Sequence, residues 1–243
     1  MGERNFSHYH DGQSVHGVER ALVQDQRKMP NPFVVITLIV FIFAVVLFAV
    51  AGTLSWWQGW MFIALYGIFM LIAAFQLKKD PQLLARRVNV EQDAITKKVP
   101  TMLNLFFLCF PLAALDKHFG WSLMPLPLII VGAVAVACGC ALIIWVFREN
   151  SFASASIKVE ESQTIITTGP YSLVRHPMYL GIILMVLFAP LTLGSWWALI
   201  PAALVIPMNV IRLHGEEELL ASQLPAYHDY QEQTLFKLFP GIW

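Results

Sequence analysis

The sequence predicts an all-α, polytopic membrane protein with about six transmembrane helices and a C-terminal cytoplasmic amphipathic helix. Hydrophobic residues make up 57% of the 243 positions and charged residues only 13%, well below the quarter that is typical of a soluble domain. Several uncharged runs are long enough to cross the ~30 Å hydrocarbon core of a bilayer. The Lys and Arg residues are also distributed unevenly between the predicted loops, as in membrane proteins with a fixed orientation.

The chain divides into a polar N-terminal tail, residues 1–32, a four-span half, residues 33–147, and a C-terminal half, residues 148–243. The first uncharged run, residues 33–54, would form a helix of roughly 33 Å, which is enough for one crossing. A second apolar run follows the corner Ser55-Trp56-Trp57 and continues to Leu77. These two runs predict a tight helical hairpin.

Residues 78–99 are polar and predict a short helix on the membrane surface. Asp80 is a good N-cap, and Pro81 suits the first helical position of the segment PQLLARRV. A third apolar run, residues 100–115, is predicted to end where Asp116, Lys117 and His118 interrupt it. The fourth, residues 123–147, is rich in Gly, Ala and Cys, which suits close packing of helices.

Residues 148–175 are polar and predict an extended or re-entrant connection. The next 35 residues, 177–211, carry no charge. That length is too great for one crossing and sufficient for two short helices, with the turn predicted at Leu193-Gly194-Ser195. From Arg212 onward the sequence is amphipathic.

The positions of Lys and Arg predict that both termini are cytoplasmic. With the N-terminus inside, only Lys117 of the 16 Lys and Arg residues lies outside. The same topology places residues 148–176 and the segment after Arg212 on one side of the membrane.

Positive and negative charges balance at 16 each, so nothing in the overall charge favours a nucleic-acid partner. Cys109, Cys138 and Cys140 lie in apolar runs and are interpreted as small hydrophobic residues, not as disulfide partners or metal ligands.

The segment 169–181, GPYSLVRHPMYLG, predicts a helix that begins at Pro177 on the cytoplasmic side. The free amides of such a helix start attract carboxylates or phosphates, and Arg175 beside them adds a positive charge. Gly181, one turn further, would let a ligand or another helix approach the backbone. The alternative is structural: His176-Pro177 only starts a helix, Arg175 reaches the interface, and Gly181 packs against a neighbour.

The segment after the apolar hairpin places Arg212 and Glu216 four residues apart on one helix face, with Glu217 about 100° around. Three successive carboxylates, residues 216–218, repel one another unless a cation is near. In the structural alternative the helix is solvated and Arg212 pairs with Glu216. Opposite the first segment, however, the two would form a site for a zwitterion, with Arg and amides for its carboxylate and Glu for its ammonium.

The C-terminal half resembles the isoprenylcysteine carboxyl methyltransferase family, in particular through TTGPYSLVRHPMYLG, the pattern from Arg212 to Leu220, and LPAYHDY before the final PGIW. Phospholipid N-methyltransferases share the general pattern. The resemblance covers about residues 150–243 and implies an integral-membrane methyltransferase that uses S-adenosylmethionine and acts on a lipophilic acceptor. The sequences of these segments are similar to those of the bacterial branch of this family, which implies that the protein lies in a bacterial inner membrane.

The resemblance also implies roles for individual residues. The cofactor pocket would be lined by Tyr171, His176, Tyr179 and Gly181, with Glu216 and Glu217 at the ammonium or ribose of the cofactor. Carboxylates of cofactor or substrate would be held by Arg175 and Arg212, which together with His176 are the candidate catalytic residues. Tyr227, and with it Tyr230, would close over the adenine or else anchor the interface. Asn150 would lie near the acceptor, and no metal is implied.

The acceptor stays open between a prenylated carboxylate, a phospholipid amine such as phosphatidylethanolamine, and a small hydrophobic molecule. A carboxylate or thiolate is already nucleophilic, whereas an amine must first lose a proton, for which His176 and Glu217 are the candidate receivers.

Two other classes of protein are considered. A membrane reductase would use NADPH, but the last hundred residues have no basic cluster for its 2′-phosphate. A non-enzymatic scaffold would leave residues 216–218 solvated. The sequence indicates no oligomeric state.

Overall fold

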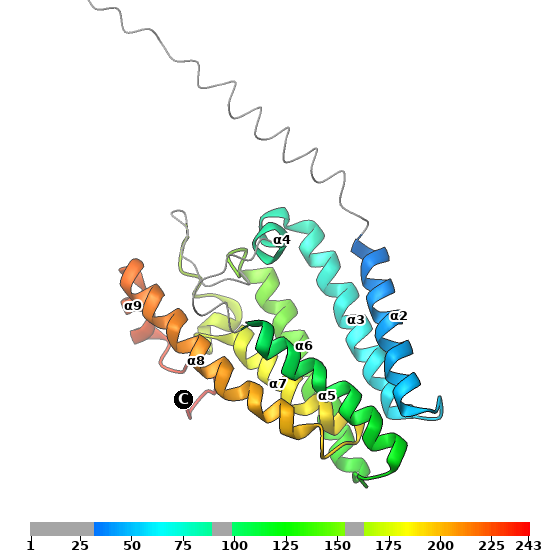
Figure 1. Cartoon of the computed structure of the whole chain (residues 1–243). Helices are drawn as coiled ribbons and strands as arrows, with labels where there is room; N and C mark the ends of the chain where they lie inside the picture. Colours follow the sequence, from blue (N-terminus) through cyan, green and yellow to red (C-terminus); the bar gives the residue numbers. More distant parts are fainter. Residues whose placement is uncertain (1–31, 89–98, 154–162) are drawn as a thin grey trace, which may run out of the picture.

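The computed structural model describes residues 32–88, 99–153 and 163–243, and over these ranges the chain is helical with no β-strand (Figure 1). The predicted all-α class is confirmed. The elements in chain order are α2 Pro32–Ala51, α3 Trp57–Lys79, α4 Pro81–Val88, α5 Val99–Phe119, α6 Leu126–Glu149, the 3-10 turn η2 Gly169–Ser172, α7 Pro177–Leu193, α8 Leu199–Gln223 and α9 Ala226–Gln233. The predicted tail, residues 1–32, lies outside the described residues except for Pro32.

The long helices α2, α3, α5, α6, α7 and α8 form the body of the molecule (Figure 1). Four of them, α2, α3, α5 and α6, are long and apolar enough to cross a membrane, and α7 is a shorter apolar helix. α7 and α8 form the predicted hairpin. Its turn lies at Gly194, whose φ of 79° is in the left-handed region that glycine adopts readily. The described helices therefore confirm a polytopic helical membrane protein, with four helices that can span and the shorter apolar α7.

α5 extends further than predicted, because Asp116, Lys117 and His118 do not interrupt it. The helix runs to Phe119, and the buried Asp116 carboxylate is satisfied by neighbouring turns. Its Oδ1 accepts from the Ser122 amide at 2.7 Å, and its Oδ2 accepts from the Ser122 hydroxyl at 2.6 Å and the Ser195 hydroxyl at 2.5 Å. Asp116 thus joins the α5–α6 turn to the α7–α8 turn at what we call the turn end of the molecule.

α8 also differs from the prediction, since Arg212 does not begin a separate amphipathic element. The helix continues without interruption from Leu199 to Gln223. The residues after Ile211 are mainly Leu and Glu, which are good helix formers, and Gly215 costs only about 1 kcal/mol in a helix interior. The carboxylates after Arg212 are therefore held rigidly on the helix that pairs with α7.

α6 and α7 pack closely because glycines lie at their contact. A Cβ atom on Gly139 of α6 would lie 2.7 Å from the backbone oxygen of Gly181 on α7, and one on Gly132 would lie 2.7 Å from the Thr192 amide nitrogen. Such approach of two backbones is typical of membrane helices with small residues at the interface. Cys109 and Cys140 are buried in the adjoining hydrophobic core and all three cysteines are free, in agreement with the sequence prediction.

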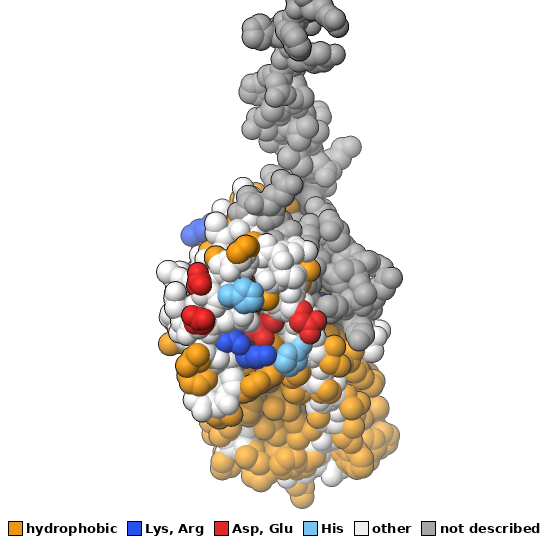
Figure 2. Space-filling view, turned by 90° about the vertical axis from the view of Figure 1, so that its left-hand side faces the viewer, with side chains coloured by type: hydrophobic (Ala, Val, Ile, Leu, Met, Phe, Trp, Pro, Cys, Tyr) orange, Lys and Arg blue, Asp and Glu red, His pale blue; other side chains and the backbone are white. Residues whose placement is uncertain are grey.

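The end of the molecule opposite the turn end carries α4, the start of α7 and α9, and we call it the polar end (Figure 1). Figure 2 shows charged and His side chains gathered on the upper part of one face, above a surface of apolar side chains. α4 begins as predicted: Asp80 Oδ1 accepts from the amides of Gln82 at 3.1 Å and Leu83 at 3.0 Å. Leu83 is buried against Val146 of α6, so α4 is fixed to the polar end.

Candidate active site

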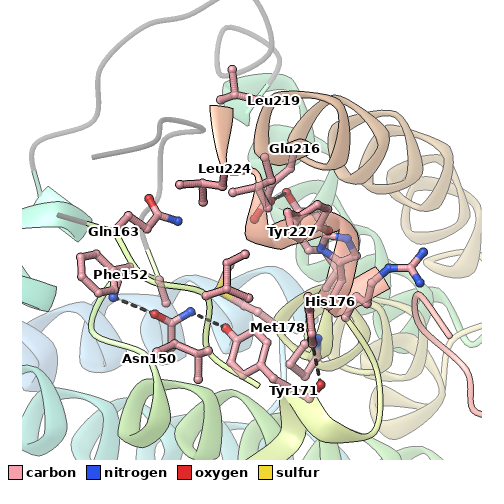
Figure 3. A pocket seen from close by; sticks show the side chains of 18 of the residues that line it. Asn150, Phe152, Gln163, Tyr171, His176, Met178, Glu216, Leu219, Leu224 and Tyr227 are labelled. Atoms are coloured by element: carbon pink, nitrogen blue, oxygen red, sulfur yellow. Dashed lines mark hydrogen bonds between the residues drawn. The ribbon is translucent and has the colours of Figure 1, made fainter. Parts of the chain in front are cut away.

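A cavity lies at the polar end between the end of α6, the segment before α7, the second half of α8 and α9 (Figure 3). Most of the side chains that the sequence singled out face it. Its lining includes Asn150, Phe152, Gln163, Tyr171, Arg175, His176, Met178, Tyr179, Arg212, Glu216, Leu220, Leu224, Tyr227 and Tyr230. Two predicted residues, Gly181 and Glu217, do not line it.

The turn that contains Tyr171 is shaped by Gly169. Its φ of 58° suits glycine, and a Cβ there would lie 2.6 Å from the Glu149 side chain. Tyr171 is then fixed from both sides: its hydroxyl accepts from Asn150 Nδ2 at 2.8 Å, and its backbone oxygen accepts from the Tyr230 hydroxyl at 2.8 Å. Burial raises the pKa of Tyr171 to about 12, so its phenol stays protonated at neutral pH.

Tyr179 joins the two predicted segments. Its hydroxyl donates to Glu216 Oε2 at 2.6 Å and accepts from Arg212 Nε at 3.1 Å. Tyr179 is on the first turn of α7, one turn from Arg175, whereas Arg212 and Glu216 are on α8. The structure therefore brings together at the cavity the three side chains that the sequence placed on either side of an apolar hairpin.

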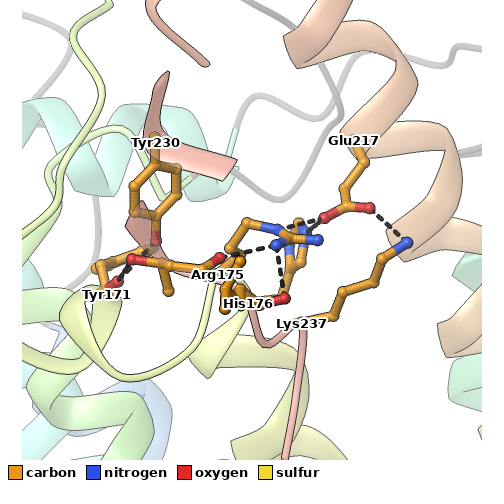
Figure 4. Close-up of polar contacts among 8 residues, drawn as sticks. Tyr171, Arg175, His176, Glu217, Tyr230 and Lys237 are labelled. Carbon is orange, nitrogen blue, oxygen red and sulfur yellow. Dashed lines mark hydrogen bonds and ion pairs between the residues drawn. The ribbon is translucent and has the colours of Figure 1, made fainter. Parts of the chain in front are cut away.

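Glu217 has a different environment, because its carboxylate is buried among three basic side chains of the protein itself (Figure 4). Glu217 Oε1 lies 2.8 Å from Arg175 Nε and 3.2 Å from His176 Nε2, and Oε2 lies 2.7 Å from Lys237 Nζ. Arg175 and Glu217, predicted to contact opposite ends of a ligand, contact each other. The sequence did not single out Lys237, since an isolated Lys near the end of a chain gives no signal of an ion pair.

The same cluster fastens the segment after α9 to the start of α7. Arg175 Nη1 donates to the backbone oxygens of Thr234 at 2.7 Å and Leu235 at 2.9 Å. The amides of Arg175 and His176 donate to the backbone oxygens of Phe236 and Lys237 at 2.9 and 3.0 Å. The RHP segment is thus a structural junction as well as part of the cavity wall.

Gly181 lies at the crossing of α6 and α7. A Cβ atom there would lie 2.7 Å from Ile143 Cγ1 and 3.0 Å from the Gly139 oxygen. This position corresponds to the structural alternative for Gly181, close packing of helices.

α9 covers one side of the cavity with two buried tyrosines. The Tyr230 hydroxyl bonds to Tyr171, as described above, but the buried Tyr227 hydroxyl has no hydrogen-bond partner among the residues that the structure describes. Burial raises the pKa of Tyr227 well above its ordinary value, so this hydroxyl is a donor. A buried donor without a partner beside a cavity is a feature expected of a ligand site.

Arg87 of α4 is a residue near the cavity that sequence reasoning missed. Its guanidinium contacts the sulfur of Met178, which lines the cavity, and lies 4.7 Å from the ring of Phe147. Burial lowers its pKa to about 10, so it remains charged at neutral pH. The pattern PQLLARRV indicated a surface helix only, and no periodicity in it distinguishes Arg87 from its neighbour Arg86.

Within the described ranges, the cavity therefore combines the carboxylate of Glu216 with guanidinium groups and the amide end of α7, and it has aromatic walls. Such a set suits a ligand that carries both charges and a flat ring. Among the residues that the structure describes, no group of three or more His, Cys, Asp or Glu side chains could hold a metal ion.

Comparison with known proteins gives a match for this half of the chain. Residues 127–226, from α6 to the start of α9, match the family described as phospholipid methyltransferase. This range contains the segment GPYSLVRHPMYLG and the carboxylates of α8. The helical membrane fold and this match together support an integral-membrane methyltransferase.

Residues 15–75 match a second family, described as sodium/calcium exchanger protein. The part of this range that the structure describes is the α2–α3 hairpin, where residues 32–75 contain no Asp or Glu. Ca²⁺ sites in proteins rely on oxygen ligands, chiefly carboxylates, and the described part of this range offers no carboxylate.

No curated protein matches the chain. The chain is similar to a solved structure with 20% sequence identity and a TM-score of 0.44, over 95% of this chain and 94% of the other. That structure is described as the eukaryotic intramembrane Ras methyltransferase, isoprenylcysteine carboxyl methyltransferase, without a monobody. A likeness of that size carries no functional argument.

Proposed function

We propose that this protein transfers a methyl group from S-adenosylmethionine to a lipophilic acceptor, in the cavity at its polar end. The observation that carries the proposal is the meeting of Tyr179, Arg212 and Glu216 at one cavity, within the range that matches a methyltransferase family. The cavity opens at the end of an apolar bundle, where a soluble donor and a membrane-borne acceptor can both arrive.

The residues of the cavity fit this donor. Glu216 suits the ammonium of its amino-acid end, because among the described residues it supplies a carboxylate to the cavity wall. Arg212 and the amides at the start of α7 suit the carboxylate. The unpartnered Tyr227 hydroxyl and its ring suit a polar aromatic group such as adenine. The role proposed from the sequence for Glu217, contact with the donor, stays a prediction.

When bound, S-adenosylmethionine supplies a methyl group that its sulfonium charge has already activated. The chain therefore contributes mainly alignment and exclusion of water. Tyr179 orients Glu216 and Arg212 through its hydroxyl, and Tyr171 holds Asn150 at the wall nearest α6. For an amine acceptor, His176 is the proton receiver that lines the cavity, whereas Glu217 does not line it and is paired with Arg175 and Lys237.

Three acceptor classes remain, and observations favour two of them. The family match points to a phospholipid amine, whereas the segments resemble enzymes that methylate prenylated carboxylates. Labelled-methyl transfer from the donor into phosphatidylethanolamine or into a farnesylcysteine compound, by the same purified protein, decides between them. Label in neither, with label recovered in a small hydrophobic molecule, would favour the third class.

We infer that the polar end faces the cytoplasm. Of the Lys and Arg residues in the described ranges, Lys117 is the one at the turn end, and an excess of basic residues marks the cytoplasmic side. The bacterial inner membrane is the location implied by the resemblance. Cysteine labelling at Ser122 and at Ser222, each replaced by Cys, tests the orientation from either side of sealed vesicles.

Calorimetric titration with S-adenosylhomocysteine and with NADPH tests the cofactor. We expect the first to bind and the second not to bind. Glu216→Gln should weaken binding by about tenfold or more, the loss expected for a charge-assisted hydrogen bond, whereas the exposed neighbour Glu218→Gln should bind as the wild type does. Binding of NADPH would favour a reductase, and binding of neither compound to folded protein would favour a scaffold.

A further inference from the structure

A second groove lies on the membrane-facing surface of α3, near the polar end. It is lined by Leu71, Ile72, Phe75, Gln76 and Lys79 of α3 and by Arg148 of α6. None of these residues lines the cavity described above, so the groove is a separate feature.

The lower part of the groove is apolar and open. Leu71, Ile72 and Phe75 are 44%, 40% and 50% exposed, and they follow one another on one face of a helix that can cross a membrane. In a bilayer this surface contacts acyl chains.

The upper part of the groove carries two positive charges. Lys79 Nζ lies 4.3 Å from the centre of the Phe75 ring, which directs it over the groove. Arg148 is fixed by Gln76: with the amide turned so that its oxygen faces the guanidinium, this oxygen accepts from Nε at 2.9 Å and from Nη2 at 3.3 Å. Among the residues that the structure describes, neither cation lies within ion-pair distance of a carboxylate.

We propose that this groove binds an anionic phospholipid, with its phosphate between Lys79 and Arg148 and one acyl chain along Leu71, Ile72 and Phe75. The charges are complementary, because Arg and Lys are the side chains that bind phosphate and both have donors available here. The depth is also suitable, since the cations lie at the helix ends and the apolar face continues toward the membrane centre. Basic pockets between transmembrane helices bind lipid head groups in this way.

Lys78 provides a matched control at the same helix end. It is exposed like Lys79 and carries the same charge, but it lies over the ring of Phe33 on α2, 5.8 Å from its centre, and does not line the groove. A general attraction of basic residues for an anionic surface would depend equally on Lys78 and Lys79. A built site would depend on Lys79 and Arg148 alone.

Native mass spectrometry of the purified protein with dioleoylphosphatidylglycerol, and separately with dioleoylphosphatidylcholine, tests the proposal. We expect the anionic lipid to bind tighter, and Lys79→Gln or Arg148→Gln to weaken it about fivefold each, as expected for one cation near a lipid surface. Lys78→Gln should leave the affinity unchanged. Both replaced groove residues are exposed, so unfolding temperatures without lipid should match the wild type.

Several outcomes would overturn the proposal. Equal affinity for the two lipids would remove the phosphate site, and equal losses in Lys78→Gln and Lys79→Gln would reduce it to general surface charge. Competition by millimolar inorganic phosphate, with no contribution from the acyl chains, would indicate a phosphate site in place of a lipid site. None of these results depends on whether the protein transfers methyl groups.

Discussion

Replacing Glu217 by Gln should destabilise the polar end of the molecule. The change removes the negative charge that lies 2.8 Å from Arg175 Nε, 3.2 Å from His176 Nε2 and 2.7 Å from Lys237 Nζ. Breaking a buried ion pair by removing one partner costs about 3–5 kcal/mol. Lys237 is 21% exposed and can turn toward water, whereas Arg175 is 8% exposed and cannot. We therefore expect a loss near the lower limit, about 3 kcal/mol.

Thermal unfolding in detergent measures this loss. For a chain of this size 1 kcal/mol corresponds to roughly 2–4 °C in Tm, so Glu217→Gln should unfold about 6–12 °C below the wild type. Limited proteolysis should also cut after α9 sooner, because the segment from Thr234 to Lys237 loses its anchor. The control is Glu218→Gln, which changes the same charge at an exposed position. Equal Tm values for the two variants would refute the interpretation of Glu217 as a structural centre.

Two further perturbations test the packing and the capping of helices. Gly139→Ala should lower the Tm, because the new Cβ would lie 2.7 Å from the Gly181 oxygen and overpacking costs about 1–3 kcal/mol. The control is Gly67→Ala, whose Cβ would meet nothing closer than 3.7 Å. A similar Tm for both variants would contradict the close contact of α6 and α7. Asp80→Ala should loosen α4 by about 1 kcal/mol through loss of its N-cap, seen as faster amide exchange in residues 82–88, and unchanged exchange would exclude a capping role. Burial raises the pKa of Asp80, but hydrogen bonds from Ser151 and the α4 amides outweigh this effect and hold the pKa below its ordinary 3.8. The cap should therefore be complete above about pH 4. It should be lost as the pH falls through the lowered folded-state pKa.

The fold was predictable from the sequence wherever a local signal decides the structure. Uncharged runs predicted the spans, Asp80 and Pro81 predicted the start of α4, and Gly194 predicted the turn of the hairpin. Asp116 was misread as an interruption of α5 because its partners, Ser122 and Ser195, lie in turns that become neighbours only after folding. A buried carboxylate in a helix has no local signature that distinguishes it from a breaker.

The candidate site was predictable in its location but not in its pairing. Charge distribution placed Tyr179, Arg212 and Glu216 on one side of the membrane, and the structure brings them to one cavity. The sequence could not tell which of two adjacent carboxylates faces that cavity. The choice depends on the rotation of α8 and on Lys237, which arrives from a segment that no periodicity connects to α7.

The fastening of the segment after α9 has a consequence for biosynthesis. Arg175 donates to the backbone oxygen of Thr234, 59 residues later in the chain. While the ribosome is still making those residues, α7 can enter the bilayer, but Lys237 is not yet available to pair with Glu217. The contacts that fasten the segment after α9 to the start of α7 are therefore among the last to form during synthesis.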